Sequence, residues 1–243
     1  ETSNNKSMSF PNKVLNQAYL SPQDKADIAF GVENDVDFIA CSFVSTRQDL
    51  LDVRAYLQEI QAPDVALIAK IENRSGIENV ESICEACEGI MIARGDLGVE
   101  IPFAEVPAVQ KNLIRKCRLL GVRVLTATEM RETMISNPKP TRAAISDGAN
   151  AVYDGTDAVM LSGETAQGKY PLEALQMMVH IIENTEQHLD YDTMLNTTGE
   201  QLKGGLSSAI GYSSVLAAAN LNAKCIITPT VSGATTRVVS NLR

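Results

Sequence analysis

The chain has 243 residues, of which 44% are hydrophobic and 21% are charged, as in ordinary soluble globular proteins. Its formal net charge of −9 argues against a nucleic-acid-binding protein, because such proteins carry a basic patch or stripe. The sequence contains no apolar run long enough to span a membrane, and its first residues do not have the pattern of a signal peptide, so we expect none. We therefore expect a cytoplasmic protein of one or two domains whose partners include neither nucleic acid nor membrane.

The five cysteines also favour a reducing compartment, because their number is odd. Cys84 and Cys87 form a C-x-x-C pattern inside a segment of helical pattern, and no second pair completes a zinc site. We interpret them as half-buried helix residues. His180 and His188 lie in another helical stretch, away from the motifs described below, so we expect solvated side chains there.

Short apolar runs rich in β-branched residues recur along the chain at the spacing of β/α units in a parallel sheet. The predicted strands are residues 36–43, 65–71, 89–93, 122–127 and 158–161. Helix-start signals precede the segments between them, namely the cap residues Ser21 and Thr46 and the first-turn prolines Pro107 and Pro171. This alternation predicts an α/β fold.

Polar residues follow every predicted strand. They are Ser42, Lys70-Ile71-Glu72-Asn73, Arg94-Gly95-Asp96, Thr126-Ala127-Thr128-Glu129 and Ser162-Gly163-Glu164. An open doubly wound sheet would concentrate its site at one switch point, whereas a TIM barrel recruits every strand end to one face. The pattern therefore favours a partial TIM (β/α)8 barrel with about five of eight strands, and we assign residues 1–192 to the second half of this barrel.

The character of the sequence changes after about residue 189. Residues 190–205 are polar and contain two glycine-rich points, which is typical of a linker. A helix of small residues is predicted over 207–220 and a strand over 225–228, followed by a Ser/Thr/Gly loop and a helix start. We therefore expect residues 193–243 to form a linker and the beginning of a second α/β domain.

Lys70, Glu72 and Asp96 have the chemistry of a site. Neighbouring parallel strands lie about 5 Å apart, so Glu72 and Asp96 at adjacent strand ends can share one hard cation. Mg²⁺ or Mn²⁺ suits a site with few protein ligands and open positions for water or phosphate. Lys70 lies two residues before Glu72 and points to the same side of the strand, where an ammonium favours phosphoryl transfer. A buried network of salt bridges is the alternative interpretation.

Two further strand ends offer polar groups. Gly95 and Gly98 flank Asp96, and glycine lets backbone N–H groups approach a ligand such as a carboxylate closely. The hydroxyl of Thr128 can pass a proton directly or through water. A tight turn and a structural hydroxyl remain the alternatives.

Four stretches, in this order and spacing, resemble the pyruvate kinase family. They are Lys70-Ile71-Glu72-Asn73, the run GIMIARGDLG at residues 89–98, Pro140-Thr141-Arg142-Ala143 and the run MLSGETA at residues 160–166. The resemblance covers nearly the whole chain and is closest to bacterial members. It implies phosphoryl transfer from phosphoenolpyruvate to ADP, giving pyruvate and ATP in glycolysis, and a homotetrameric enzyme. Three barrel strands, a lid domain and most of a C-terminal domain have no counterpart here, so we expect the chain alone to be inactive.

The resemblance also assigns roles. Lys70 and Thr128 are implied to be catalytic, and Lys70, Gly95, Asp96 and Thr128 to bind substrate. Glu72 and Asp96 are implied to hold Mg²⁺ or Mn²⁺, with K⁺ held by residues outside this sequence. Thr230, Ser232 and Thr235 resemble a loop that binds the phosphate of an allosteric sugar phosphate, which hydroxyls and N–H groups at a helix start would suit.

A metal-dependent aldolase or lyase of the wider phosphoenolpyruvate/pyruvate barrel group is the alternative function. Such enzymes also place a glutamate and an aspartate on consecutive strand ends. Lys70 and the Ser162–Ala166 run favour the kinase.

Overall fold

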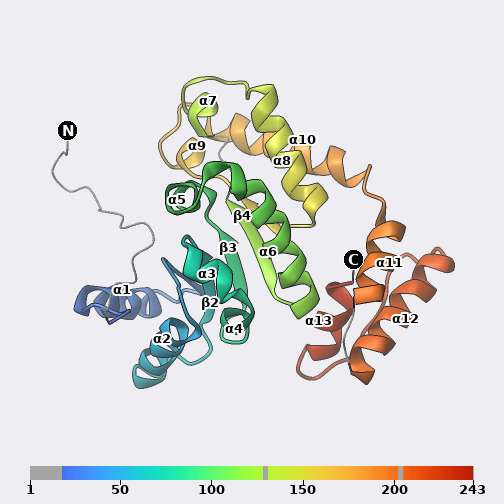
Figure 1. The fold of residues 1–243 in the computed structure, drawn as a ribbon, viewed down its shortest axis with the longest axis horizontal. Coiled ribbons are helices and arrows are strands. Elements are labelled where there is room, and N and C mark those ends of the chain that lie inside the picture. Colours follow the sequence, from blue (N-terminus) through green and yellow to red (C-terminus); the bar gives the residue numbers. More distant parts are fainter. Residues whose placement is uncertain (1–17, 128–130, 202–204, 243) are drawn as a thin grey trace.

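The computed structural model describes residues 18–127, 131–201 and 205–242 (Figure 1). Its five strands form one sheet in the order β1-β2-β3-β4-β5, and every neighbouring pair is parallel. The strands are β1 (Phe38–Cys41), β2 (Ala66–Ile71), β3 (Gly89–Ile92), β4 (Arg123–Ala127) and β5 (Ala158–Met160). Each lies within its predicted run, so the predicted α/β class with a five-strand parallel sheet is confirmed.

Helices precede, connect and follow the strands. They are α1 (Pro22–Glu33), α2 (Arg47–Glu59), α3 (Arg74–Glu78), α4 (Val80–Cys84), α5 (Arg94–Glu100), the 3₁₀ turn η1 (Phe103–Glu105), α6 (Val106–Leu120), α7 (Arg131–Ser136), α8 (Arg142–Asp154), α9 (Gly163–Ala166) and α10 (Pro171–Glu186). The predicted start signals hold: Ser21 Oγ accepts a hydrogen bond from the Asp24 N–H at the start of α1, and prolines occupy the first turns of α6 and α10.

The main core lies between one face of the sheet and the helices that cover it. Alternate residues of β2, Leu67, Ala69 and Ile71, are fully buried. They pack in one cluster with apolar side chains of α2, α4 and α6. The intervening residues of β2, including Lys70, are half-buried on the opposite face. The alternation therefore turns Lys70 away from the apolar core.

The paired cysteines belong to this core. Cys84 is the last residue of α4 and Cys87 follows the helix, whereas the sequence pattern placed both inside it. Both are buried, with exposed fractions of 6% and 9%, because they pack under the sheet. The two histidines are exposed, as predicted.

Helices α11 (Tyr191–Gln201), α12 (Leu206–Asn220) and α13 (Ala234–Ser240) follow the sheet and lie together at one end of the molecule (Figure 1). Helix α11 occupies most of the predicted linker over 190–205, so this segment is largely helical, whereas its polar composition suggested irregular structure. The reason is a local cap: the Asp190 carboxylate accepts hydrogen bonds from the N–H and the hydroxyl of Thr193, at 3.0 and 2.7 Å. Leu195 on the same helix is buried.

The predicted strand over 225–228 is wrong. These residues have no regular secondary structure, because no second strand lies beside them among the described residues to form a ladder. No helix in the described part of the chain has the length and apolarity needed to cross a membrane.

Candidate active site

Lys70 and Glu72 meet at the carboxyl end of β2. Lys70 Nζ lies 2.7 Å from Glu72 Oε1 and donates a hydrogen bond of 3.1 Å to Ser42 Oγ. The pairing of Cys41 with Ala69 places Ser42, the next residue of the chain, beside Lys70. The structure therefore brings together polar residues from the ends of two neighbouring strands, as the sequence predicted.

Glu72 is a buried carboxylate with an exposed fraction of only 1%. Its Oε2 accepts a hydrogen bond of 2.5 Å from the N–H of Phe43. Its Oε1 contacts the Lys70 ammonium but makes no hydrogen bond of good geometry. Phe43 has a φ of 53°, a left-handed conformation that is unfavourable for an aromatic residue. The loop after β1 is thus held in a strained conformation that presents its N–H to the carboxylate.

The charges around Glu72 oppose one another. Burial raises the pKa of its carboxyl group, whereas the Lys70 ammonium and the Phe43 N–H favour the charged form and lower it. The carboxylate of Asp96 adds a further raising effect, so this negative charge is near enough to act on Glu72. A cation bound near both carboxylates would relieve that repulsion.

Asp96 and Gly95 lie in the first turn of α5, directly after β3. Strand β3 pairs with β2 so that Ile71 faces Ile92, which brings the start of α5 to the strand end that carries Glu72. Asp96 is exposed and Gly95 is half-buried. N–H groups in the first turn of an α-helix have no partner within the helix and are available to a ligand.

The residues present fit a hard divalent cation. Glu72 and Asp96 could each offer a carboxylate oxygen to such an ion, and Glu72 Oε1 is a buried carboxylate oxygen without a hydrogen bond among the described residues. Within the described residues no group of three or more His, Cys, Asp or Glu side chains could hold a metal ion. Two carboxylates are what Mg²⁺ takes when substrate oxygens and water complete its shell.

Two other polar positions noted from the sequence, Thr128 and Glu164, are not among the contacts of Lys70 and Glu72 described above. Thr128 lies outside the described residues. At the end of β5, Glu164 is fully buried, its Oε2 accepts a hydrogen bond of 2.9 Å from the Ser162 N–H, and its Oε1 is buried without one. Glu164 was noted from the sequence only as a polar residue near this face.

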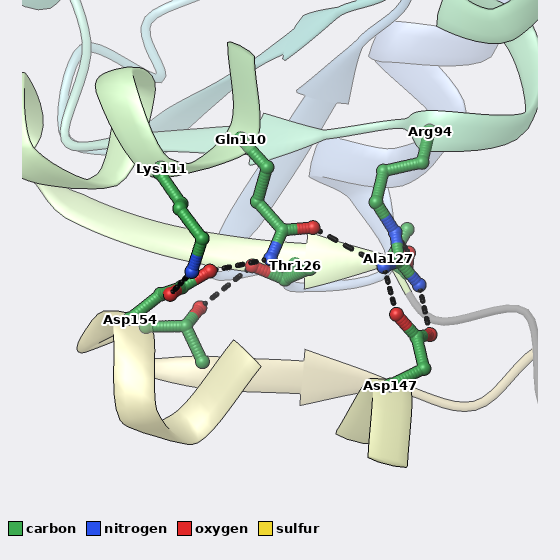
Figure 2. Close-up of polar contacts among 8 residues, drawn as sticks. Arg94, Gln110, Lys111, Thr126, Ala127, Asp147 and Asp154 are labelled. Atoms are coloured by element: carbon green, nitrogen blue, oxygen red, sulfur yellow. Dashed lines mark hydrogen bonds and ion pairs between the residues drawn. The ribbon is translucent and has the colours of Figure 1, made fainter. Parts of the chain in front are cut away.

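Sequence reasoning missed the contacts of Arg94, which Figure 2 shows. The Arg94 side chain donates to the carbonyl oxygen of Ala127 at the end of β4, to Gln110 on α6 and to the carboxylate of Asp147 on α8. The sequence singled out this stretch for its glycines and for Asp96, and assigned no role to the Arg94 side chain. Gln110 and Asp147 are far from Arg94 in the chain and belong to no motif, so no local signal pointed to them.

The candidate effector residues lie elsewhere, at the loop before α13, which is well separated from α5 in Figure 1. Thr230 Oγ1 accepts a hydrogen bond of 3.1 Å from the Gly233 N–H, and Ser232 Oγ accepts one of 3.4 Å from the Ala234 N–H. Thr235 is in the first turn of α13 and is exposed. The three hydroxyl residues therefore share one loop and helix start.

Comparison with known proteins gives a consistent result. A family model described as pyruvate kinase, barrel domain, matches residues 1–175. The chain is 48% identical over 240 residues to pyruvate kinases of Bacillus licheniformis and Geobacillus stearothermophilus. Each match covers 99% of this chain and 41% of the relative. The chain thus spans about two-fifths of the length of these curated relatives.

A solved structure agrees with these relatives. The crystal structure of a pyruvate kinase from Cryptosporidium parvum superposes with a TM-score of 0.90 and 39% sequence identity. The match covers 96% of this chain and 49% of that one. The five-strand sheet therefore matches part of a barrel, as predicted, and the relatives named here are pyruvate kinases, not aldolases or lyases.

Proposed function

Because the chain belongs to the pyruvate kinase family, we propose that it contributes to an enzyme that transfers the phosphoryl group of phosphoenolpyruvate to ADP, giving pyruvate and ATP in glycolysis. The observation that carries this proposal is the contact between the half-buried Lys70 and the buried Glu72 at the end of β2, where the charge of Asp96 also acts on Glu72. One ammonium and two carboxylates suit a divalent cation and a moving phosphoryl group. The activity belongs to an enzyme of the relatives' full length that carries residues 1–243, called the full-length enzyme below.

Each residue has a role in the proposal. Glu72 and Asp96 hold Mg²⁺ or Mn²⁺, which supplies Lewis-acid stabilisation of the oxygens that gain charge. The Lys70 ammonium neutralises charge on the phosphoryl group as it moves. The N–H groups of Gly95 and Asp96 receive the substrate carboxylate, and the hydroxyl of Thr128 serves in protonating the enolate carbon. The family further suggests K⁺, bound by residues outside this sequence, a homotetramer and a cytoplasmic location.

The test is Lys70→Met in the full-length enzyme. A charge used mainly in the transition state acts on kcat, so kcat should fall by at least about 100-fold while KM for phosphoenolpyruvate changes less. Steady-state turnover of phosphoenolpyruvate, with and without ADP, measures this. Strict dependence on ADP separates the kinase from the aldolase or lyase alternative.

The control for Lys70→Met is Lys116→Met, which removes a lysine paired at 2.8 Å with Glu81 on the helical side of the sheet. Its kcat should equal that of the parent. If Lys70→Met is folded, as judged by its Tm, and keeps a kcat near that of the parent, Lys70 has no part in the transfer.

For the loop before α13 we propose that Thr230, Ser232 and Thr235 bind the phosphate of a sugar-phosphate effector. Their support is the shared loop geometry described above. Thr235→Glu places a carboxylate where the phosphate would lie and should abolish activation by a sugar phosphate, because like charges repel. A titration with fructose 1,6-bisphosphate and with ribose 5-phosphate measures activation.

The matched control for Thr235→Glu is Ser240→Glu at the opposite end of α13, where the hydroxyl donates to the Arg237 carbonyl oxygen at 3.0 Å. It should keep the activation of the parent. If Thr235→Glu responds to both sugar phosphates as the parent does, the loop is not an effector site.

A further inference from the structure

The guanidinium group of Arg94 is bound by three separate elements. Its Nε donates to the Ala127 carbonyl oxygen at 2.8 Å, and its Nη1 donates to Gln110 Oε1 at 3.1 Å. Its Nη1 and Nη2 donate in parallel to the two carboxylate oxygens of Asp147, each at 2.5 Å. Figure 2 shows the side chain reaching from the start of α5 to β4 and α8.

This arrangement is stronger than a surface ion pair. The Arg94 side chain is only 12% exposed, so its contacts are largely shielded from water. Two parallel hydrogen bonds between a guanidinium and a carboxylate fix both distance and orientation, which a lysine ammonium cannot do. The side chain is therefore held rigidly, and with it the backbone of residue 94.

That backbone leads directly into the proposed site. Arg94 is the first residue of α5, and Gly95 and Asp96 follow it. The residue that precedes α5, Ala93, has the unusual φ and ψ of −90° and 80° and has no polar side chain to cap the helix. Its N–H donates a long hydrogen bond of 3.4 Å to the Ile71 carbonyl oxygen at the end of β2. The Arg94 contacts add a stronger, charged anchor from β4, α6 and α8.

We propose that Arg94, held by Asp147, is a positioning residue that sets where Gly95 and Asp96 lie relative to Glu72. The proposal rests on the function proposed above for Gly95 and Asp96. Arg94 acts through the backbone of α5 and touches neither the metal nor the substrate. A displacement of about 1 Å in such a group can cost about 100-fold in rate, so the anchor matters to catalysis although it lies outside the reacting atoms.

The network continues away from the site. Gln110, which accepts from Arg94, donates through its Nε2 to Asp154 Oδ2 at 2.9 Å, and Lys111 also pairs with Asp154. The Lys111 side chain is 60% exposed and directs its ammonium to Asp154, at the far side of Gln110 from the guanidinium (Figure 2). Lys111→Met is therefore a matched control, since it removes a cation from the same network and leaves the guanidinium contacts in place.

The experiment compares Arg94→Lys, Asp147→Asn and Lys111→Met in the full-length enzyme. Arg94→Lys keeps the positive charge but removes the two parallel hydrogen bonds from the guanidinium to the Asp147 carboxylate. We expect kcat to fall about 10- to 100-fold, Mn²⁺ to bind several-fold more weakly, and amide hydrogen exchange in α5 to speed up at least tenfold, with exchange in α6 unchanged. Asp147→Asn should shift all three quantities in the same direction, and Lys111→Met should match the parent.

The double variant Arg94→Lys/Asp147→Asn should be little worse than Arg94→Lys alone, because both changes break one interaction. If Arg94→Lys leaves α5 exchange and kcat within twofold of the parent, the proposal is overturned. A parent enzyme without turnover of phosphoenolpyruvate would overturn the proposed function instead, and α5 exchange would still test the anchor.

Discussion

Glu72 is the residue on which the proposed site depends most, and its position is costly. It is 1% exposed, and a charged carboxylate in such surroundings is unfavourable unless it is paired. Oε2 accepts a hydrogen bond from the Phe43 N–H, while Oε1 lies against the Lys70 ammonium without a hydrogen bond of good geometry among the described residues. A buried charge that is incompletely balanced, beside a second carboxylate, is the arrangement expected of a cation ligand.

Glu72→Gln tests that interpretation in the full-length enzyme. The amide oxygen can still accept from the Phe43 N–H, so the shape of the site is kept while one ligand charge is lost. We expect the Kd for Mn²⁺ to rise at least tenfold, with Tm changed by only a few degrees. Titration of Mn²⁺ followed by electron paramagnetic resonance measures the affinity directly.

Glu164→Gln is the matched control, because Glu164 is also fully buried and accepts from a backbone N–H at 2.9 Å. Its Mn²⁺ affinity should be that of the parent. Equal losses in the two variants, or none in Glu72→Gln, would remove Glu72 from the metal site.

The sequence indicates the candidate residues of this site better than it indicates the hydrogen bonds that hold them in place. Lys70 and Glu72 were grouped correctly because residues two apart in a strand share a face. Two interactions could not be foreseen. They are the hydrogen bond from the Phe43 N–H to Glu72 and the paired hydrogen bonds from Arg94 to Asp147. They join positions 29 and 53 residues apart in the chain, and only the packing of separate β/α units brings them together.

At the scale of the elements, the sequence shows most clearly why each helix begins where it does. In α1, Ser21 Oγ accepts from the Asp24 N–H, while the N–H and hydroxyl of Ser21 both donate to the Asp24 carboxylate, at 2.8 and 2.6 Å. These hydrogen bonds lower the pKa of Asp24 below its usual 3.8. The charged carboxylate at this helix start also interacts favourably with the helix dipole.

The sign of the resulting pH dependence follows from the lowered pKa. The Asp24 contribution is fully present above pH 3.8, the ordinary value, and is lost as the pH falls through the lower folded value. Asp24→Asn should reduce hydrogen-exchange protection of α1 amides about twofold to fivefold at pH 7, equivalent to about 0.3–1 kcal/mol for an exposed charge at a helix start. The difference from the parent should stay constant down to about pH 3.8 and narrow only as the pH falls below it, through the lower folded pKa of Asp24.

The control for Asp24→Asn is Asp27→Asn, which changes an acid in the same helix that accepts a hydrogen bond of 2.7 Å from the Gln23 side chain. It should leave α1 protection nearly unchanged. A difference between Asp24→Asn and the parent that does not depend on pH would show that the capping charge is not its cause.

Elements near the C-terminal end were predicted less well. Residues 190–205 read as a linker because they are polar, yet the Asp190–Thr193 cap starts α11 there. Residues 225–228 have the composition of a strand but no neighbouring strand among the described residues. Composition alone does not reveal whether a cap forms or whether a strand finds a partner, since both depend on specific hydrogen bonds.

At the scale of the whole molecule, the sheet is open at both sides within the described residues. The central strand β3 is buried at all four positions, whereas three of the four residues of β1, and every residue of β5, are at least partly exposed. Phe38 on β1 is 51% exposed. Edge strands of this kind present unpaired N–H and C=O groups that can pair with another chain.

We therefore expect residues 1–243, produced alone, to self-associate and to transfer little phosphate. Exposed apolar surface costs about 25 cal/mol per Å², so a few hundred Å² would offset most of a net stability of about 5–15 kcal/mol. Light scattering after size-exclusion chromatography measures association, and a coupled assay with phosphoenolpyruvate and ADP measures transfer. A soluble monomer with cooperative unfolding, or turnover at a rate typical of an enzyme, would contradict the expectation.

Phe38→Lys separates edge pairing from general instability. A lysine on an edge strand opposes pairing with another chain, because the charge would have to be buried in the new contact. If association begins at β1, the variant should stay monomeric at a several-fold higher protein concentration than the parent chain. Its Tm should fall little, because the Phe38 side chain is already 51% exposed. Ile227→Lys is the matched control, since Ile227 is 84% exposed but lies in no strand. Equal gains in solubility from both variants would show that exposed apolar area, and not the open edge of the sheet, drives association.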